Sequence, residues 1–195
     1  MIEFTAEQIE KAERLLQHIP GGAQKALSRS MNRAVDSAKT EASRKARETY
    51  HIRHKDVLDT IKVSKSSPSD LSAMVLSRGH VLPLTKFITR PNKPQPAKAA
   101  ALRWNKGRPF NLVVRVKRGE GGSIKKAFVA QMKSGHLGVF HRSNKNRLPL
   151  VQRFGPSVPE MLGNIRVTDA VERRATAVMD ERLDHEIKRM LEGQT

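Results

Sequence analysis

The stretch ALSRSMNRAVDSAKTEASRKARETY, residues 26–50, decides the fold because it predicts one long helix. It contains neither Gly nor Pro, and its apolar and small residues recur three and four positions apart, as on one helical face. We expect this helix to run from about Ala23 to Tyr50. Its apolar face is mostly alanine, and small side chains let another backbone approach closely, which indicates tight packing against a sheet or a second helix.

Shorter helices are expected on both sides of this stretch. Upstream, Thr5 with Gln8 forms a capping-box pattern, and Pro20 with the two glycines after it ends the first helix. Downstream, residues 53–60 indicate one short helix.

The C-terminal part also predicts a helix. Ser157 with Glu160 forms another capping box, and Asp169 with Glu172 gives a second start pattern after a possible interruption at residues 163–164. A helical apolar stripe then continues to the end, formed by Val171, Ala175, Val178, Met179, Leu183, Ile187, Met190 and Leu191.

Between these helices the apolar pattern changes to period two, which is typical of strands. Six strands are predicted, at Ile61–Ser64, Leu71–Leu76, Leu82–Phe87, Leu112–Lys117, Ala127–Met132 and Leu137–Arg142. The sequences GEGG (119–122) and KSGH (133–136) are expected to be hairpin turns. We therefore expect an α+β fold, with N-terminal helices and a C-terminal helix packed on a central antiparallel β-sheet or partial barrel.

Three regions follow from this order of elements. Residues 1–60 form an N-terminal helical region, residues 61–155 a basic β body, and residues 156–195 a C-terminal helix. The β body contains a basic, proline-rich loop at residues 90–109.

The basic residues are concentrated in the middle of the chain. Residues 51–150 hold 21 Lys and Arg against 4 Asp and Glu, a net charge of +17, whereas residues 1–50 carry +2 and residues 151–195 carry −1. Such a surplus repels itself unless an anion lies near. Nucleic acid and an acidic neighbouring subunit remain equally open, and a membrane surface is less favoured because the charge does not lie on an amphipathic helix.

The sequence offers little for catalysis. There is no Cys and no phosphate-binding loop, nucleophile elbow or zinc-protease motif. His51 and His54 lack an evident third ligand, and the middle segment holds only four carboxylates, whereas a metal-dependent nuclease needs them clustered. We expect no catalytic residue, no metal site and no cofactor. No apolar run is long enough to span a membrane, and the acidic N-terminal segment does not predict a signal peptide.

Few aromatic residues are available to stack on bases. Phe128 and Phe140 fall in apolar strands and are expected in the core. Trp104, between Arg103 and Lys106, is either an exposed stacking residue or a buried loop anchor.

Three stretches together resemble the prophage minor tail protein Z family of lambda-like phages. They are residues 26–63, an Ala- and Arg-rich helix leading into a first strand; KKAFVAQMKSGHLGVFHRSNKNRLPL, residues 125–150; and GPSVPEM, residues 155–161. In the second stretch two strands are joined by a Gly turn and followed by an Arg-x-Pro exit. Residues 90–110 depart from the family pattern.

The resemblance implies a structural minor tail protein for tail completion at the head–tail junction, and not an enzyme. The implied partners are other tail and neck proteins, such as the tail terminator and head-completion proteins, and further copies of this chain, in a hexameric ring around the DNA channel by analogy with other neck proteins. It further implies a place at the head-proximal end of the virion tail, in the host cytoplasm during assembly, with no membrane contact.

Together with the charge, this implies that the β body faces double-stranded DNA. The candidate DNA-facing residues are Lys117, Arg118, Lys125, Lys126, Arg142, Lys145 and Arg147. For each of them, a solvated charge or an intersubunit salt bridge is an equally open alternative. Two other functions also remain open, namely a freestanding, sequence-independent nucleic-acid-binding protein and a nuclease.

Overall fold

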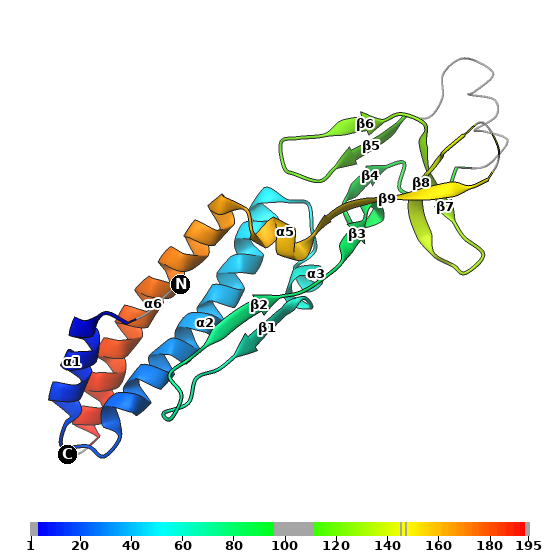
Figure 1. Cartoon of the computed structure of the whole chain (residues 1–195). Helices are drawn as coiled ribbons and strands as arrows, with labels where there is room; N and C mark the ends of the chain where they lie inside the picture. Colours follow the sequence, from blue (N-terminus) through cyan, green and yellow to red (C-terminus); the bar gives the residue numbers. More distant parts are fainter. Residues whose placement is uncertain (1–3, 96–110, 145, 147, 194–195) are drawn as a thin grey trace. The chain divides into compact units, whose positions relative to one another are not determined.

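A computed structural model describes residues 4–95, 111–144, 146 and 148–193 of the chain (Figure 1). The chain divides into two compact units. We call residues 1–45, 57–78 and 162–195 the helical unit, and residues 46–56 and 79–161 the sheet unit.

Three helices dominate the helical unit, α1 (Ala6–Leu16), α2 (Gly22–Thr49) and α6 (Ile165–Glu192). The capping box predicted for α1 is confirmed, since the Thr5 hydroxyl accepts from Gln8 N–H and the Gln8 side chain accepts from Thr5 N–H. One end of all three helices shares a buried apolar cluster, formed by Ala12, Leu16, Ala23, Ala26, Leu27, Leu183 and Ile187. The small residues of α2 are therefore buried, as the sequence predicts.

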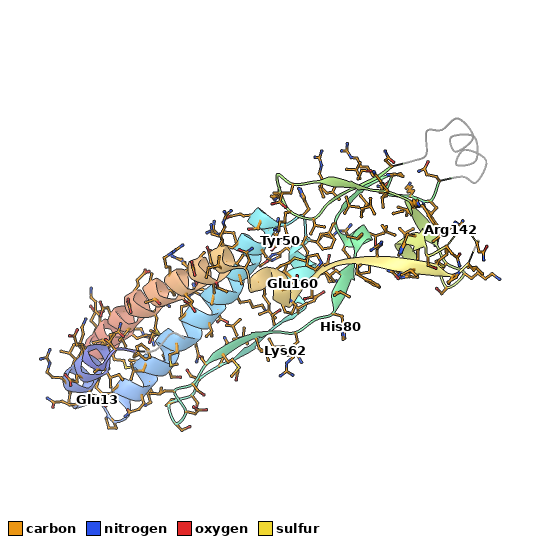
Figure 2. All side chains as sticks on the ribbon, turned by 45° about the horizontal axis from the view of Figure 1, so that its top comes forward. Glu13, Tyr50, Lys62, His80, Arg142 and Glu160 are labelled. Carbon is orange, nitrogen blue, oxygen red and sulfur yellow. The ribbon has the colours of Figure 1, made fainter. Side chains whose placement is uncertain are left out.

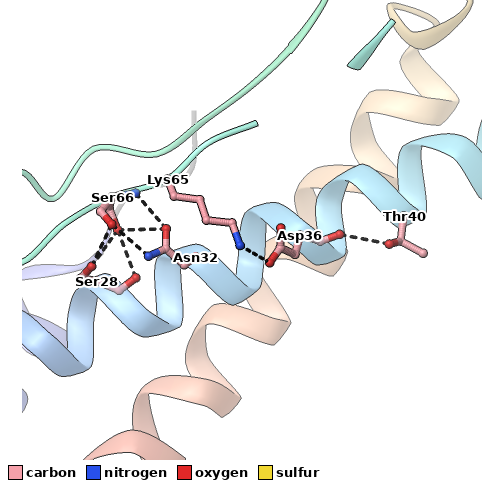
Figure 3. Close-up of polar contacts among 6 residues, drawn as sticks. All are labelled: Ser28, Asn32, Asp36, Thr40, Lys65 and Ser66. Carbon is pink, nitrogen blue, oxygen red and sulfur yellow. Dashed lines mark hydrogen bonds and ion pairs between the residues drawn. The ribbon is translucent and has the colours of Figure 1, made fainter. Parts of the chain in front are cut away.

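The helical unit also contains a two-stranded antiparallel hairpin, β1 (Ile61–Ser64) with β2 (Met74–Ser77). Its connecting loop is fixed to α2 by side-chain hydrogen bonds (Figure 3). Asn32 and Ser28 on α2 bond to Ser66, and Lys65 forms an ion pair with Asp36 at 2.9 Å. The loop of the hairpin is thus joined to the long helix by several polar contacts.

The sheet unit contains two antiparallel sheets. One has the strand order β3-β9-β8-β7 and the other β4-β5-β6. The strands are β3 (Val81–Pro83), β4 (Ile88–Arg90), β5 (Leu112–Arg115), β6 (Gly122–Ile124), β7 (Ala127–Gln131), β8 (Leu137–Arg142) and β9 (Leu150–Ser157). A 3₁₀ turn, η1 (Leu84–Lys86), lies between β3 and β4. Two short helices complete the described elements, α3 (His54–Leu58) and α5 (Val158–Leu162).

The α+β class is confirmed, and within the described ranges the strands form three small antiparallel sheets with no barrel. Both hairpin turns are also confirmed. The chain reverses between β5 and β6, and Met132 N–H bonds to His136 C=O across the turn that contains Gly135 at φ +82.

Several element boundaries were predicted wrongly, each for a local reason. The strand expected at Leu82–Phe87 ends at Pro83, because the chain turns through η1 before it enters a different sheet as β4 at Ile88. β2 begins at Met74 and not at Leu71, because Asp70 accepts from Ser72 N–H and extends the preceding turn. β4, β6 and β9 had not been predicted.

Two predictions for the C-terminal helix were also wrong. α6 starts at Ile165 and not at Asp169, because the Asn164 side chain accepts from Arg166 N–H and caps the helix. Leu191, expected on the buried stripe, is 39% exposed. None of the described helices has the length and apolar character that crossing a membrane requires.

Candidate nucleic-acid interface

The net positive charge of the chain belongs almost entirely to the sheet unit. By sequence, this unit holds 20 Lys and Arg against 4 Asp and Glu, whereas the helical unit holds 17 against 15. The net charges are therefore +16 and +2. The division into units in space therefore separates the charge almost as sharply as the sequence segments do.

Three carboxylates of the sheet unit contact other groups of the same unit. Asp56 forms an ion pair with Lys86 at 2.6 Å, and Glu120 lies 4.0 Å from Lys117. Glu160 accepts from Ser157 N–H at 3.4 Å, in the predicted capping box of α5. These contacts leave most of the positive surplus of the unit uncompensated.

Three of the candidate residues come together at one end of the β7–β8 pair. Ala127 is paired with His141, so Lys126, just before β7, lies at the same end of this pair as Arg142, the last residue of β8. Lys125 and Lys126 form the turn that takes the chain from β6 in one sheet to β7 in the other. We call Lys125, Lys126 and Arg142 the β7–β8 cation cluster.

Lys126 has an uncommon backbone conformation. Its φ is +59, and it is the one non-glycine residue with positive φ among those the structure describes. This region favours glycine, because the Cβ of any L residue is crowded there. A lysine at this turn therefore costs stability that a glycine would not.

Arg142 is positioned by an aromatic ring. Its Cζ lies 5.4 Å from the centroid of Phe128, a cation–π distance. Phe128 is paired with Phe140, so Arg142 reaches the ring diagonally across the strand pair. Figure 2 labels Arg142 among the strands of the sheet unit. The predicted core position is confirmed for Phe140, which is buried, whereas Phe128 is only half-buried.

Lys117 and Arg118 lie elsewhere, in the turn between β5 and β6. Arg118 N–H bonds to Thr49 C=O, and the Arg118 guanidinium Nε donates to Arg47 C=O at 2.7 Å. Both carbonyls belong to the last turn of α2, where backbone acceptors lack partners within the helix. Arg118 therefore stabilises the end of α2, a structural role that the sequence had not indicated.

The remaining candidates, Lys145 and Arg147, lie outside the described residues, as do Trp104 and residues 96–109 of the predicted basic loop. The structure thus places five of the seven candidates, in two separate groups.

A hollow in the sheet unit involves residues that sequence reasoning did not select. It is lined by His51, Val113, Arg115, Gly119, Glu120 and Gly121. Partial burial, and then the positive charges of Arg118 and Arg115, lower the pKa of His51 below its usual value of 6.5. Nothing in the spacing of His51 and Arg115 along the chain indicated that they would line the same hollow.

Comparison with known families decides the identity of the chain. Residues 7–194 match the family model described as Prophage minor tail protein Z (GPZ). The chain belongs to the minor tail protein Z family. Searches of curated proteins and of solved structures gave no match. The family resemblance inferred from three stretches therefore extends over nearly the whole chain.

This minor tail protein Z family member is a structural phage tail protein and not an enzyme. The nuclease alternative needs several carboxylates in one place. Across the described residues, no three His, Asp or Glu side chains gather in a way that could hold a metal ion. The Lys and Arg side chains of the sheet unit are groups that bind anions.

Proposed function

We propose that this family member is a ring subunit at the head-proximal end of the phage tail, with its sheet unit facing the DNA channel. The observation that carries the proposal is the uneven charge, +16 on the sheet unit against +2 on the helical unit. A protein that lines a DNA channel needs a positively charged surface only on the part that faces the DNA.

Electrostatics explains why such contacts require no sequence recognition. Double-stranded DNA carries one negative charge per about 1.7 Å of its axis, and cations that neutralise phosphates release condensed counterions. Contacts to phosphates position a protein without reading bases. The β7–β8 cation cluster supplies such charges at one end of a strand pair, from the last residue of β8 and the turn before β7.

The nearly neutral helical unit is suited to protein contacts. Its surface carries both signs of charge, so neighbouring copies and other tail and neck proteins could pack on it without strong repulsion. We assign to this unit the contacts within the ring and with the tail terminator and head-completion proteins.

Cryo-electron microscopy of the neck and tail of virions that contain this chain tests the proposal. We expect density for the chain at the head-proximal end of the tail, repeated by rotational symmetry around the DNA, with the sheet unit inward. The number of copies follows from that symmetry. Virions that lack the chain, or that carry it only at the distal tip, would contradict the proposal.

Binding measurements separate this function from that of a freestanding nucleic-acid-binding protein. A subunit that relies on many neighbours in a ring should bind duplex DNA weakly by itself, and mainly at low salt. Tight binding by the isolated chain at physiological salt, together with its absence from virions, would favour the freestanding protein instead.

A further inference from the structure

The hollow described above is lined in part by the loop between β5 and β6, residues 116–121, which backbone hydrogen bonds hold in place. Across its base, Val114 is paired with Gly122 in the β5–β6 ladder. His51 N–H bonds to Val116 C=O at 2.8 Å, and Arg118 N–H bonds to Thr49 C=O at 2.8 Å. These backbone hydrogen bonds hold the loop against the residues that follow α2. Side chains on the loop are therefore preorganised for binding.

Arg115 is held in the hollow by its packing on a glycine. A Cβ built on Gly121 would lie 2.7 Å from Arg115 Cγ, closer than real side chains approach. The stem of Arg115 therefore occupies the space that any other residue at position 121 would need. This packing fixes the first part of the Arg115 side chain at the wall of the hollow.

The electrostatic environment of the hollow is positive. Burial, and then the guanidinium groups of Arg118 and Arg115, disfavour the protonated form of His51 and so lower its pKa. One carboxylate, Glu120, also lines the hollow, but its side chain is 73% exposed and lies 4.0 Å from Lys117. Lys117 thus offsets part of the negative charge that Glu120 brings.

We propose that this hollow binds a phosphate group, with Arg115 as its main ligand and His51 as a second donor. A guanidinium matches phosphate oxygens through two parallel hydrogen bonds, and an imidazole can donate one more. A bound anion would also relieve the mutual repulsion of Arg115, Arg118 and a protonated His51. The inference deepens the proposed function, since the backbone of the channel DNA is one source of this phosphate and free phosphate is the other.

The test uses the full chain and two probes, inorganic phosphate and a short DNA duplex. Phosphate is titrated at constant ionic strength, and the His51 ring is followed by NMR, with His51→Gln to assign its signals. We expect saturable binding that raises the pKa of His51, because an anion favours the charged imidazole. Arg115→Gln should weaken phosphate binding by about tenfold or more, since a charged hydrogen bond is removed.

Two further variants make the result specific. Arg115→Lys keeps the charge but removes the paired hydrogen bonds, so it should bind phosphate less tightly than wild type and more tightly than Arg115→Gln. Lys133→Gln, an equal charge change in the β7–β8 turn, should leave phosphate binding unchanged. Unaltered circular dichroism establishes that each variant is folded.

The outcomes separate this inference from the proposed function. A His51 shift of the same size in wild type and Arg115→Gln, or equally weakened binding in Lys133→Gln, overturns the phosphate site. Duplex binding can still depend on the β7–β8 cation cluster in that case, and the proposed function then stands. If Arg115→Gln no longer binds phosphate but binds duplex normally, the site is upheld and its ligand is free phosphate and not DNA.

Discussion

The side-chain amide of Asn32 forms two hydrogen bonds with the backbone of Ser66, although 34 positions separate them. Asn32 Oδ1 accepts from Ser66 N–H at 2.8 Å, and Asn32 Nδ2 donates to Ser66 C=O at 2.9 Å (Figure 3). The amide therefore satisfies the loop backbone as a neighbouring strand would, and it fixes the end of β1 on α2.

Asn32→Ala should destabilise the chain by about 1–3 kcal/mol, because the N–H of the buried Ser66 is left without its acceptor. Urea unfolding measures the change in the free energy of unfolding. Lys65→Ala is the matched control, since it removes the neighbouring ion pair with Asp36 but both side chains are well exposed. It should cost less than about 1 kcal/mol. Equal destabilisation in the two variants would show that the amide is not the main attachment.

A second prediction concerns Glu186, whose side chain is only 6% exposed and lies 2.6 Å from Arg189 and 3.3 Å from Arg29. Replacing both arginines with Ala leaves a buried carboxylate without these partners. We expect destabilisation on the order of 2 kcal/mol, below the value for a fully buried pair because both guanidinium groups are half exposed. Adding Glu186→Met should restore much of this stability. A double variant as stable as wild type would contradict the argument.

A third prediction tests the β7–β8 cation cluster. Changing Lys125, Lys126 and Arg142 to Gln should reduce the dependence of log K on log salt by about 0.9 for each phosphate that is no longer neutralised, and so by up to about 2.7. Fluorescence anisotropy with duplex DNA at several salt concentrations measures this slope. A matched triple change in the helical unit, Arg33→Gln with Lys62→Gln and Arg173→Gln, should alter the slope less. Equal effects of the two triple variants would indicate that DNA binding depends on net charge and not on a defined DNA-facing surface.

A fourth prediction follows from the backbone of Lys126. Lys126→Gly should raise the free energy of unfolding by about 1 kcal/mol, because glycine accepts φ +59 without crowding. Gly135→Ala is the opposite case. Its φ is +82 and nothing lies within 4 Å of an added Cβ, so its cost of about 1 kcal/mol would be conformational alone. Thermal unfolding compares the two. A destabilised Lys126→Gly variant would mean that the lysine side chain itself stabilises the turn.

A fifth prediction concerns pH. Because burial and the charges of Arg118 and Arg115 lower the pKa of His51, the unfolded chain takes up this proton more readily than the folded chain. The contribution of His51 to stability is therefore complete above pH 6.5 and is lost as the pH falls through its folded pKa. The unfolding free energy of the wild type minus that of His51→Gln should decrease as the pH is lowered from about 8 to about 5 in phosphate-free buffer. A pH-independent difference would contradict this.

The candidate site was only partly predictable from the sequence. Lys125, Lys126 and Arg142 were selected because they flank predicted strands, and the pairing of Ala127 with His141 brings them to one end of a strand pair. Arg118 was selected on the same grounds, yet its guanidinium is bonded to the last turn of α2. Charge and strand pattern identify which residues are exposed, but they do not show which backbone carbonyl lies within reach.

The sequence by itself determined the α+β class, the long helix α2, the capping boxes at Thr5 and Ser157, and the concentration of charge. Each of these depends on residues a few positions apart or on simple composition, so hydrogen bonding and periodicity within one segment are sufficient. Only the tertiary structure decided the division of the strands among three sheets, the attachment of Ser66 to Asn32, and the presence of His51 and Arg115 in one hollow. These depend on long-range register and side-chain packing, for which many arrangements share the same local pattern.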